Sequence, residues 1–149
     1  MRINAFSDLC LRVVMLLAAT RSGELLTSRQ IADGVGVPYN HVSKAVIRLR
    51  ELGLVDVTRG RSGGAVISAA GRKATVGAVL RTLDTRATVA DCHTPNGSCP
   101  LSLECGLQGA LARAREAFYA ELDAVVISKL PHERQMAPVF VTLSTRRPA

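Results

Sequence analysis

Apolar residues recur at intervals of three and four through the first twenty residues, which predicts a helix over residues 1–20. Asp8 and Arg12 lie between these apolar residues and are spaced to pair on the helix surface. Cys10 belongs to the apolar face, so it is interpreted as a core cysteine and not as a metal ligand. The apolar face consists of Ile3, Phe6, Cys10, Val13, Val14 and Leu17.

A second helix is expected over residues 27–34, where Thr27 and Gln30 have the spacing of a capping box. After a glycine-bearing turn, Pro38 opens a longer helix over residues 38–52. A short helix, a turn and a longer helix with a polar outer side are typical of a helix-turn-helix. The apolar face of the longer helix is Val42, Ala45, Val46 and Leu49.

Two short strands over residues 54–58 and 65–68 are expected to pair as a β-hairpin. The turn between them, residues 59–64, carries Arg59, Arg61 and three glycines. A hairpin after a helix-turn-helix is the wing of a winged helix, and its glycines allow close approach to a DNA backbone. Both arginines are then placed to reach phosphates or a minor groove. A solvated basic turn is the plainer alternative.

The second half of the chain predicts a helix over residues 75–83, a cysteine-bearing loop and a long helix from about residue 100 to residue 130. The apolar stripe of the long helix has little in its own chain to pack on, which favours a helix pair between two subunits. Packing on the first helix of its own chain is the alternative. Residues 139–143 resemble a strand. The stripe comprises Leu107, Leu111, Ala114, Phe118, Leu122 and Val125, and the expected interface residues are Leu111, Phe118 and Leu122.

These patterns predict a mainly α fold with a small β-hairpin wing. Residues 1–83 are the expected winged helix-turn-helix domain and residues 84–106 the cysteine loop. Residues 107–130 are the expected dimerisation helix and residues 131–149 a tail. A chain of 149 residues is long enough to bury one real core with an appendage.

The formal net charge of +7 is unevenly distributed. Residues 1–74 hold 11 Lys and Arg against 5 Asp and Glu, whereas the remainder is nearly neutral. This asymmetry points to a polyanionic partner. Aromatic residues make up only 3%, which argues against platforms that stack on single-stranded bases. The expected DNA contacts are Arg29, Tyr39, Asn40, His41, Lys44, Arg48, Arg59 and Arg61.

Three of the four cysteines, Cys92, Cys99 and Cys105, share one short loop. A signal peptide is not expected, and the apolar run 13–20 is too short to span a bilayer, so we expect a cytoplasmic protein without a membrane partner. Thiols stay reduced in the cytoplasm, so clustered cysteines indicate metal or redox chemistry there. Three thiolates suit an iron–sulfur cluster or zinc, and both require a further ligand.

An enzyme is not expected, because the sequence has no Ser/His/Asp set, phosphate-binding loop or dinucleotide fingerprint. The three histidines, His41, His93 and His132, fall on different elements. Two other classes stay open. One is a DNA-binding sensor that uses zinc or a thiol/disulfide switch in the same loop, and the other is an electron-transfer iron–sulfur protein.

The chain resembles the IscR/NsrR family of bacterial winged-helix regulators, which hold an iron–sulfur cluster. The resemblance lies in the helices at 6–14 and 38–49, in the wing at 60–64 and in the three-cysteine loop, and it spans residues 1–130. Within the family it is most similar to the nitric-oxide-sensing repressors. Gln108 stands where the other branch has its histidine ligand.

The resemblance implies a homodimer that binds a palindromic operator, and a cluster that nitric oxide destroys to release the DNA. It implies a 4Fe-4S cluster, with 2Fe-2S as the alternative, and an IscR-like iron–sulfur or redox regulator as the alternative function. Cys92, Cys99 and Cys105 take the ligand roles, and Asp8 matches the position of an acid supplied by the partner subunit. The competing residues are Asp91, His93 and Glu104.

Overall fold

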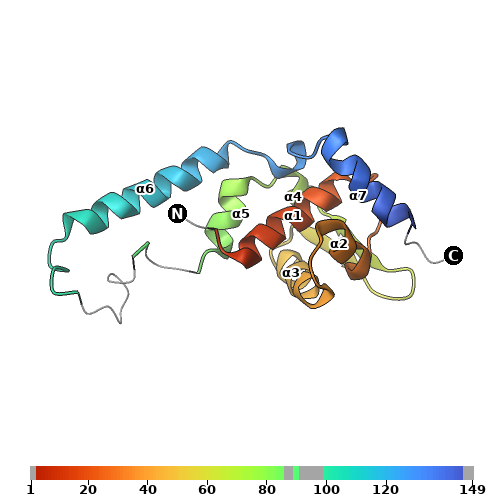
Figure 1. The fold of residues 1–149 in the computed structure, drawn as a ribbon, viewed down its shortest axis with the longest axis horizontal. Coiled ribbons are helices and arrows are strands. Elements are labelled where there is room, and N and C mark those ends of the chain that lie inside the picture. The colour runs from red at the N-terminus through yellow and green to blue at the C-terminus, as the bar shows by residue number, and fades with distance from the viewer. Residues whose placement is uncertain (1–2, 86–88, 91–98, 146–149) are drawn as a thin grey trace.

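The computed structural model describes residues 3–85, 89–90 and 99–145. Helices α1 to α5 and the hairpin form a body on which α7 packs, and α6 leads away from this body toward the segment that contains Cys99 and Cys105 (Figure 1). The elements are α1 Ala5–Ala19, α2 Ser28–Val35, α3 Tyr39–Glu51, β1 Val55–Thr58, β2 Gly64–Ile67, α4 Ala69–Lys73, α5 Val76–Leu83, α6 Gly106–Asp123, the 3₁₀ turn η2 Ile127–Lys129 and α7 Glu133–Thr145.

Helix α1 is the centre of the core, as its periodicity predicted. Cys10, Val13 and Leu17 are fully buried. The helix begins at Ala5 because the side chain of Asn4 accepts a hydrogen bond of 2.7 Å from the Ser7 amide. The predicted burial of Ile3 and Phe6 is wrong. Ile3 precedes the helix, and Phe6 lines an open hollow with Arg48 and Leu83, so the two side chains are 38% and 39% exposed.

The helix-turn-helix forms with the capping box, the glycine-bearing turn and the buried face that the sequence predicted. The Thr27 amide donates to Oε1 of Gln30 at 2.9 Å, and the Gln30 amide donates back to Oγ1 of Thr27 at 3.2 Å, which confirms the capping box. Gly36 ends α2 in the left-handed conformation, with φ +68°. The expected inner face of α3 is buried, and it consists of Val42, Ala45, Val46 and Leu49.

The hairpin is antiparallel and runs from the pair Val55 and Ile67 to the pair Thr58 and Gly64. A short helix that the sequence analysis missed, α4, follows it directly. Ser68 caps α4 by accepting from the Gly71 amide at 2.9 Å, and its hydroxyl donates to the Gly53 carbonyl at 2.6 Å. This cap fixes the hairpin against the end of α3.

Helix α5 forms where predicted, but α6 is shorter at both ends than the expected helix over residues 100–130. It begins after Cys105, because Glu104 takes a positive φ of 53°. It ends at Asp123, because β-branched residues after it pair with the start of α5. The Val76 amide donates to the Val125 carbonyl at 2.9 Å, and Thr75 forms a β-bridge with Val126.

The predicted strand over residues 139–143 is wrong, because this segment lies within helix α7. Met136 and Leu143 are buried, and Val139 and Phe140 pack against the core. Their spacing of three and four is helical, and packing on α2 overrides the strand preference of the β-branched residues. Among the described residues, no helix is both long and apolar enough to cross a membrane.

Candidate nucleic-acid interface and metal centre

The outward side of α3 carries a stripe of exposed side chains opposite the buried face. Asn40, Lys44 and Ile47 are all exposed, and their spacing of four and three residues places them on one line of the helix. Glu51 continues this line by one turn. Two of the expected DNA contacts, Asn40 and Lys44, therefore share the outer face of the second helix of the helix-turn-helix.

Tyr39 and Arg29 are brought together across the two helices. The guanidinium of Arg29 on α2 lies 5.7 Å from the centroid of the Tyr39 ring at the start of α3. This distance is in the range of a cation–π contact. Tyr39 is 48% exposed, so the pair presents a phenol and a guanidinium at the start of the recognition helix.

Arg48 is placed differently from the other expected contacts on α3. It pairs with Glu51 at 3.1 Å and lines a hollow together with Asn4, Phe6 and Thr82. It thus lies on the flank of α3 that faces α1 and α5.

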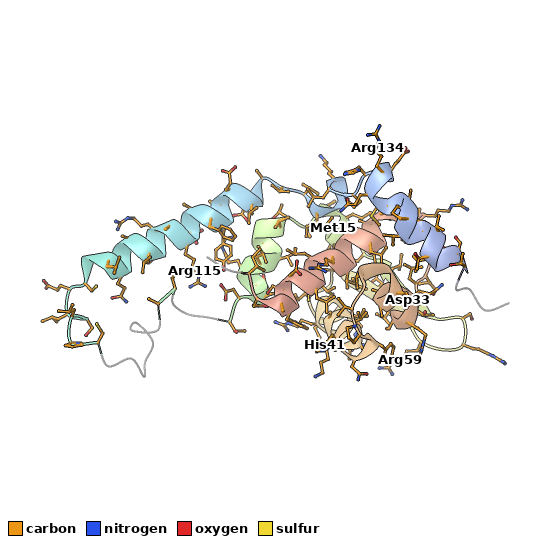
Figure 2. All side chains as sticks on the ribbon, in the orientation of Figure 1. Met15, Asp33, His41, Arg59, Arg115 and Arg134 are labelled. Atoms are coloured by element: carbon orange, nitrogen blue, oxygen red, sulfur yellow. The ribbon has the colours of Figure 1, made fainter. Side chains whose placement is uncertain are left out.

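The tip of the wing exposes Arg59 and Arg61. Gly63 must be glycine, because a Cβ there would lie 2.2 Å from the Thr58 carbonyl oxygen. Gly60 takes a φ of +112°, which other residues rarely adopt. Figure 2 shows Arg59 of the wing and His41 of α3 on the side of the body opposite Arg134. The wing and α3 therefore expose basic and polar groups on a common side.

The expected metal centre is described in part. Cys92 lies outside the described residues, as do Asp91 and His93. Cys99 and Cys105 are free, half-buried thiols. Among the described residues there is no group of three His, Cys, Asp or Glu side chains that could hold a metal ion. The three-cysteine site is therefore neither assembled nor contradicted by the described part of the chain.

The donors that are described fit a soft metal centre. Cys105 is the N-cap residue of the 18-residue helix α6, and its side chain makes no capping hydrogen bond. Its sulfur is therefore not used as a helix cap, and cysteine sulfur is a ligand that suits iron or zinc. A turn in which the Ser102 amide donates to the Cys99 carbonyl at 3.3 Å folds the chain back between the two thiols.

Cys10 and Asp8 behave as residues of α1 in this single chain. Burial raises the pKa of the Cys10 thiol to about 11, an effect that Arg48 partly offsets. This agrees with a core cysteine. Asp8 pairs with Arg12 at 2.5 Å, and both side chains are about half exposed. Cys99 and Cys105 lie in the segment before α6, away from the body that contains α1 (Figure 1), so the single chain does not bring Asp8 to either of these two thiols.

The expected interface residues lie on α6 with different environments. Phe118 and Leu122 are half-buried and pack against the core of their own chain. Leu111 is half-buried near the free end, where Leu107 is 62% exposed. The second half of α6 packs within the chain mainly on α5, and not on the first helix as the alternative expected, while its first half leaves apolar surface uncovered.

The sequence did not predict the polar contacts that join α5 to α6, which we call the α5–α6 joint. Arg81 donates to Glu116 at 2.7 Å and to Asp123 at 3.1 Å. The buried Tyr119 donates its hydroxyl to Asp84, and its pKa is raised by burial and by this hydrogen bond. The helical spacing of Glu116, Tyr119 and Asp123 is visible in the sequence, but their common partner Arg81, 35 residues before Glu116 and 42 before Asp123, is not.

The comparisons with known proteins agree with this architecture. The family model Rrf2, described as an iron-dependent transcriptional regulator, matches residues 3–133. The chain is 44% identical to the HTH-type transcriptional repressor NsrR of Streptomyces coelicolor over 147 residues, which is 98% of each chain. It is 33% identical to the HTH-type transcriptional regulator NsrR of Bacillus subtilis, over 91% of this chain and 93% of that protein.

Two solved structures show the same fold at low identity. The global cysteine regulator CymR of B. subtilis superposes with a TM-score of 0.64 at 22% identity, covering 87% of this chain and 95% of that one. IscR of T. potens superposes with a TM-score of 0.65 at 16% identity, covering 100% and 93%. These relatives are transcriptional regulators, which agrees with the expectation that the chain is not an enzyme. On the length of the family match and the identity to its members, the chain belongs to the Rrf2 family of winged-helix transcriptional regulators.

Proposed function

We propose that the protein is a cytoplasmic transcriptional repressor whose operator binding depends on an iron–sulfur cluster and is released by nitric oxide. The observation that carries the proposal is the exposed stripe of α3 beside a basic, glycine-bearing wing, in a chain 44% identical to a named repressor. The free thiols before α6 support the sensing part of the proposal.

The DNA contacts fall into two groups. Asn40 and Lys44 on the outer line of α3 enter the major groove and contact base edges, with Tyr39 and His41 at the start of the same helix. Arg59 and Arg61 at the wing tip contact phosphates or the minor groove. Arg29 supports Tyr39 through the cation–π contact, and the expected contact of Arg48 with a phosphate belongs to this proposal.

Cys92, Cys99 and Cys105 would hold the cluster, which we propose to be 4Fe-4S, with 2Fe-2S as the alternative. When bound, an iron–sulfur cluster supplies irons that react with nitric oxide. A carboxylate from Asp8 of the partner subunit would complete the ligand set. Within one chain Asp8 is paired with Arg12, so this role requires that pair to open.

The uncovered leucines at the start of α6 and in the segment just before it support a homodimer. Leu101, Leu103 and Leu107 are 78%, 90% and 62% exposed. Large apolar side chains grouped in this way usually mark an interface. A second copy that covers the first half of α6 would bury Leu107 and Leu111, and it would also place two recognition helices on one operator.

The deciding experiment is anaerobic purification followed by operator-shift titration before and after exposure to nitric oxide. The expected result is a brown protein that binds its operator tightly and loses it on exposure. Cys92→Ala, Cys99→Ala and Cys105→Ala should be colourless and bind poorly. Cys10→Ala is the matched control and should stay brown, because Cys10 is a fully buried core residue.

The colour of the protein separates the proposed cofactor from its rivals. A colourless wild-type protein that contains zinc, or one whose binding follows thiol oxidation, would overturn the cluster and leave the DNA-binding part intact. A brown protein without sequence-specific DNA binding would indicate an electron-transfer role. Asp8→Ala should keep the colour, change the absorption spectrum and weaken binding. If this variant matches the wild type, Asp8 is not a ligand.

A further inference from the structure

Ile47 is an exposed apolar side chain in the middle of the polar outer line of α3. It is 51% exposed, although the buried face of the same helix offers four apolar positions to the core. Single exposed apolar residues are common on protein surfaces and alone indicate nothing. The position of Ile47 is what distinguishes it, because it shares its line with Asn40 and Lys44.

The three residues have the spacing of a helix that reads bases. Asn40, Lys44 and Ile47 stand at i, i+4 and i+7, which are three of the four positions that a homeodomain helix uses in the major groove. Seven residues of helix advance by about 10 Å, or roughly three base pairs. A helix that places Asn40 on a base edge therefore brings Ile47 over a base pair roughly three steps away.

The C5-methyl of thymine is the one apolar substituent larger than a hydrogen that the four bases present in the major groove. An isoleucine can discriminate there only by burying this methyl, since it offers no hydrogen bond. Glu51, the next residue on the line, is paired with Arg48 at 3.1 Å, so its carboxylate does not face the DNA as an unpaired charge. The surroundings of Ile47 are thus compatible with close approach to a base pair.

We propose that Ile47 is a specificity-determining residue that packs against the C5-methyl of one thymine in each operator half-site. This inference rests on the proposed operator binding. It names the base that Ile47 contacts, thymine, and the group on that base, the C5-methyl. The half-site should carry that thymine about three base pairs from the pair read by Asn40.

The test begins with duplexes selected from a random-sequence pool by the anaerobically purified wild-type protein. Each thymine of the selected duplex is then replaced by uracil, which removes the methyl group and leaves the base pairing unchanged. At one position in each half-site, uracil should weaken wild-type binding about fourfold, the value of one buried methyl group. Ile47→Ala should bind the thymine and uracil duplexes equally at that position.

Val141→Ala is the matched control, because Val141 is an exposed apolar residue on α7, 64% exposed, outside the helix-turn-helix. It should keep the wild-type sensitivity to uracil. The comparison of thymine and uracil duplexes with the wild-type protein does not depend on whether any variant folds. If wild type selects a sequence but tolerates uracil everywhere, or if Ile47→Ala keeps the sensitivity, the inference on Ile47 is wrong and operator binding stands. If wild type selects no sequence, the proposed function itself fails, and the inference fails with it.

Discussion

Arg81 on α5 binds both carboxylate oxygens of Asp123 on α6, with N–H···O distances of 3.1 Å. The same guanidinium lies 5.1 Å from the centroid of the buried Tyr119 ring and donates to Glu116. These contacts join the DNA-binding body to α6, the helix that begins directly after Cys105. In the proposed function, a change at the cysteines that shifts α6 would act on the body through this joint.

Removing the guanidinium should loosen the end of α6 without unfolding the body. In Arg81→Ala, Glu116 and Asp123 lose the guanidinium that holds both of their carboxylates against α5. We expect faster amide hydrogen exchange in the second half of α6, measured by mass spectrometry. Arg113→Ala is the control, an exposed arginine on the same helix. Unchanged exchange in Arg81→Ala would mean that packing alone holds the joint.

Gly77 allows α5 and α6 to approach closely. A Cβ at this position would lie 2.3 Å from Oδ1 of Asp123 and 2.4 Å from the Tyr119 carbonyl oxygen. Gly77→Ala should therefore lower the free energy of unfolding by about 1–3 kcal/mol in denaturant titrations. Gly109→Ala on α6 meets only the end of the Arg113 side chain, so it should be neutral or stabilise by about 0.5–1 kcal/mol. Equal stability of the two variants would contradict this packing.

The wing and the recognition helix should differ in how they contribute to DNA binding. Arg61→Ala removes an exposed cation and should weaken binding to all sequences alike, reducing the slope of log K against log salt by about one. Asn40→Ala should relax the preference at a single base pair, at a cost of about 1–3 kcal/mol. Fluorescence anisotropy over a salt series measures both effects. Wild-type behaviour of both variants would exclude this surface as the interface.

The first half of α6 should control the oligomeric state. Leu107 is 62% exposed, so Leu107→Glu should leave the fold of a single chain intact while placing a charge in the proposed interface. Sedimentation velocity should show a monomer for this variant and a dimer for the wild type. Ala112→Glu adds the same charge to another face of the projecting helix and should remain a dimer. A monomeric wild type would remove the basis of this prediction.

The thiol of Cys10 should give the protein a marked sensitivity to alkaline pH. Its folded-state pKa of about 11 lies above its ordinary value of 9.0, because burial favours the neutral thiol. The neutral thiol therefore contributes stability that is complete below pH 9.0 and is lost as the pH rises through about 11. Denaturant titrations across this range should show a smaller loss for Cys10→Ala than for wild type. Identical pH profiles would contradict the raised pKa.

The sequence alone determined the features that rest on contacts between near neighbours. The capping box of Thr27 and Gln30, the inner face of α3 and the hairpin all depend on residues at most twelve positions apart. The same periodicity already placed Asn40 and Lys44 on the outer line of α3, since a helix fixes which residues share a side. These parts of the candidate site therefore followed from local spacing.

Tertiary structure decided the features that depend on residues far apart in the chain. The end of α6 is set by the pairing of Val125 with Val76, and residues 139–143 became helical because α2 offers them an apolar surface. Tertiary packing also positions Arg48 beside the start of α1 and Arg81 beside Asp123, because these neighbours are distant in the sequence. Packing energy gained across dozens of residues outweighs local preferences of a few tenths of a kcal/mol. The spacing of residues along the sequence does not reveal which distant segments pack together.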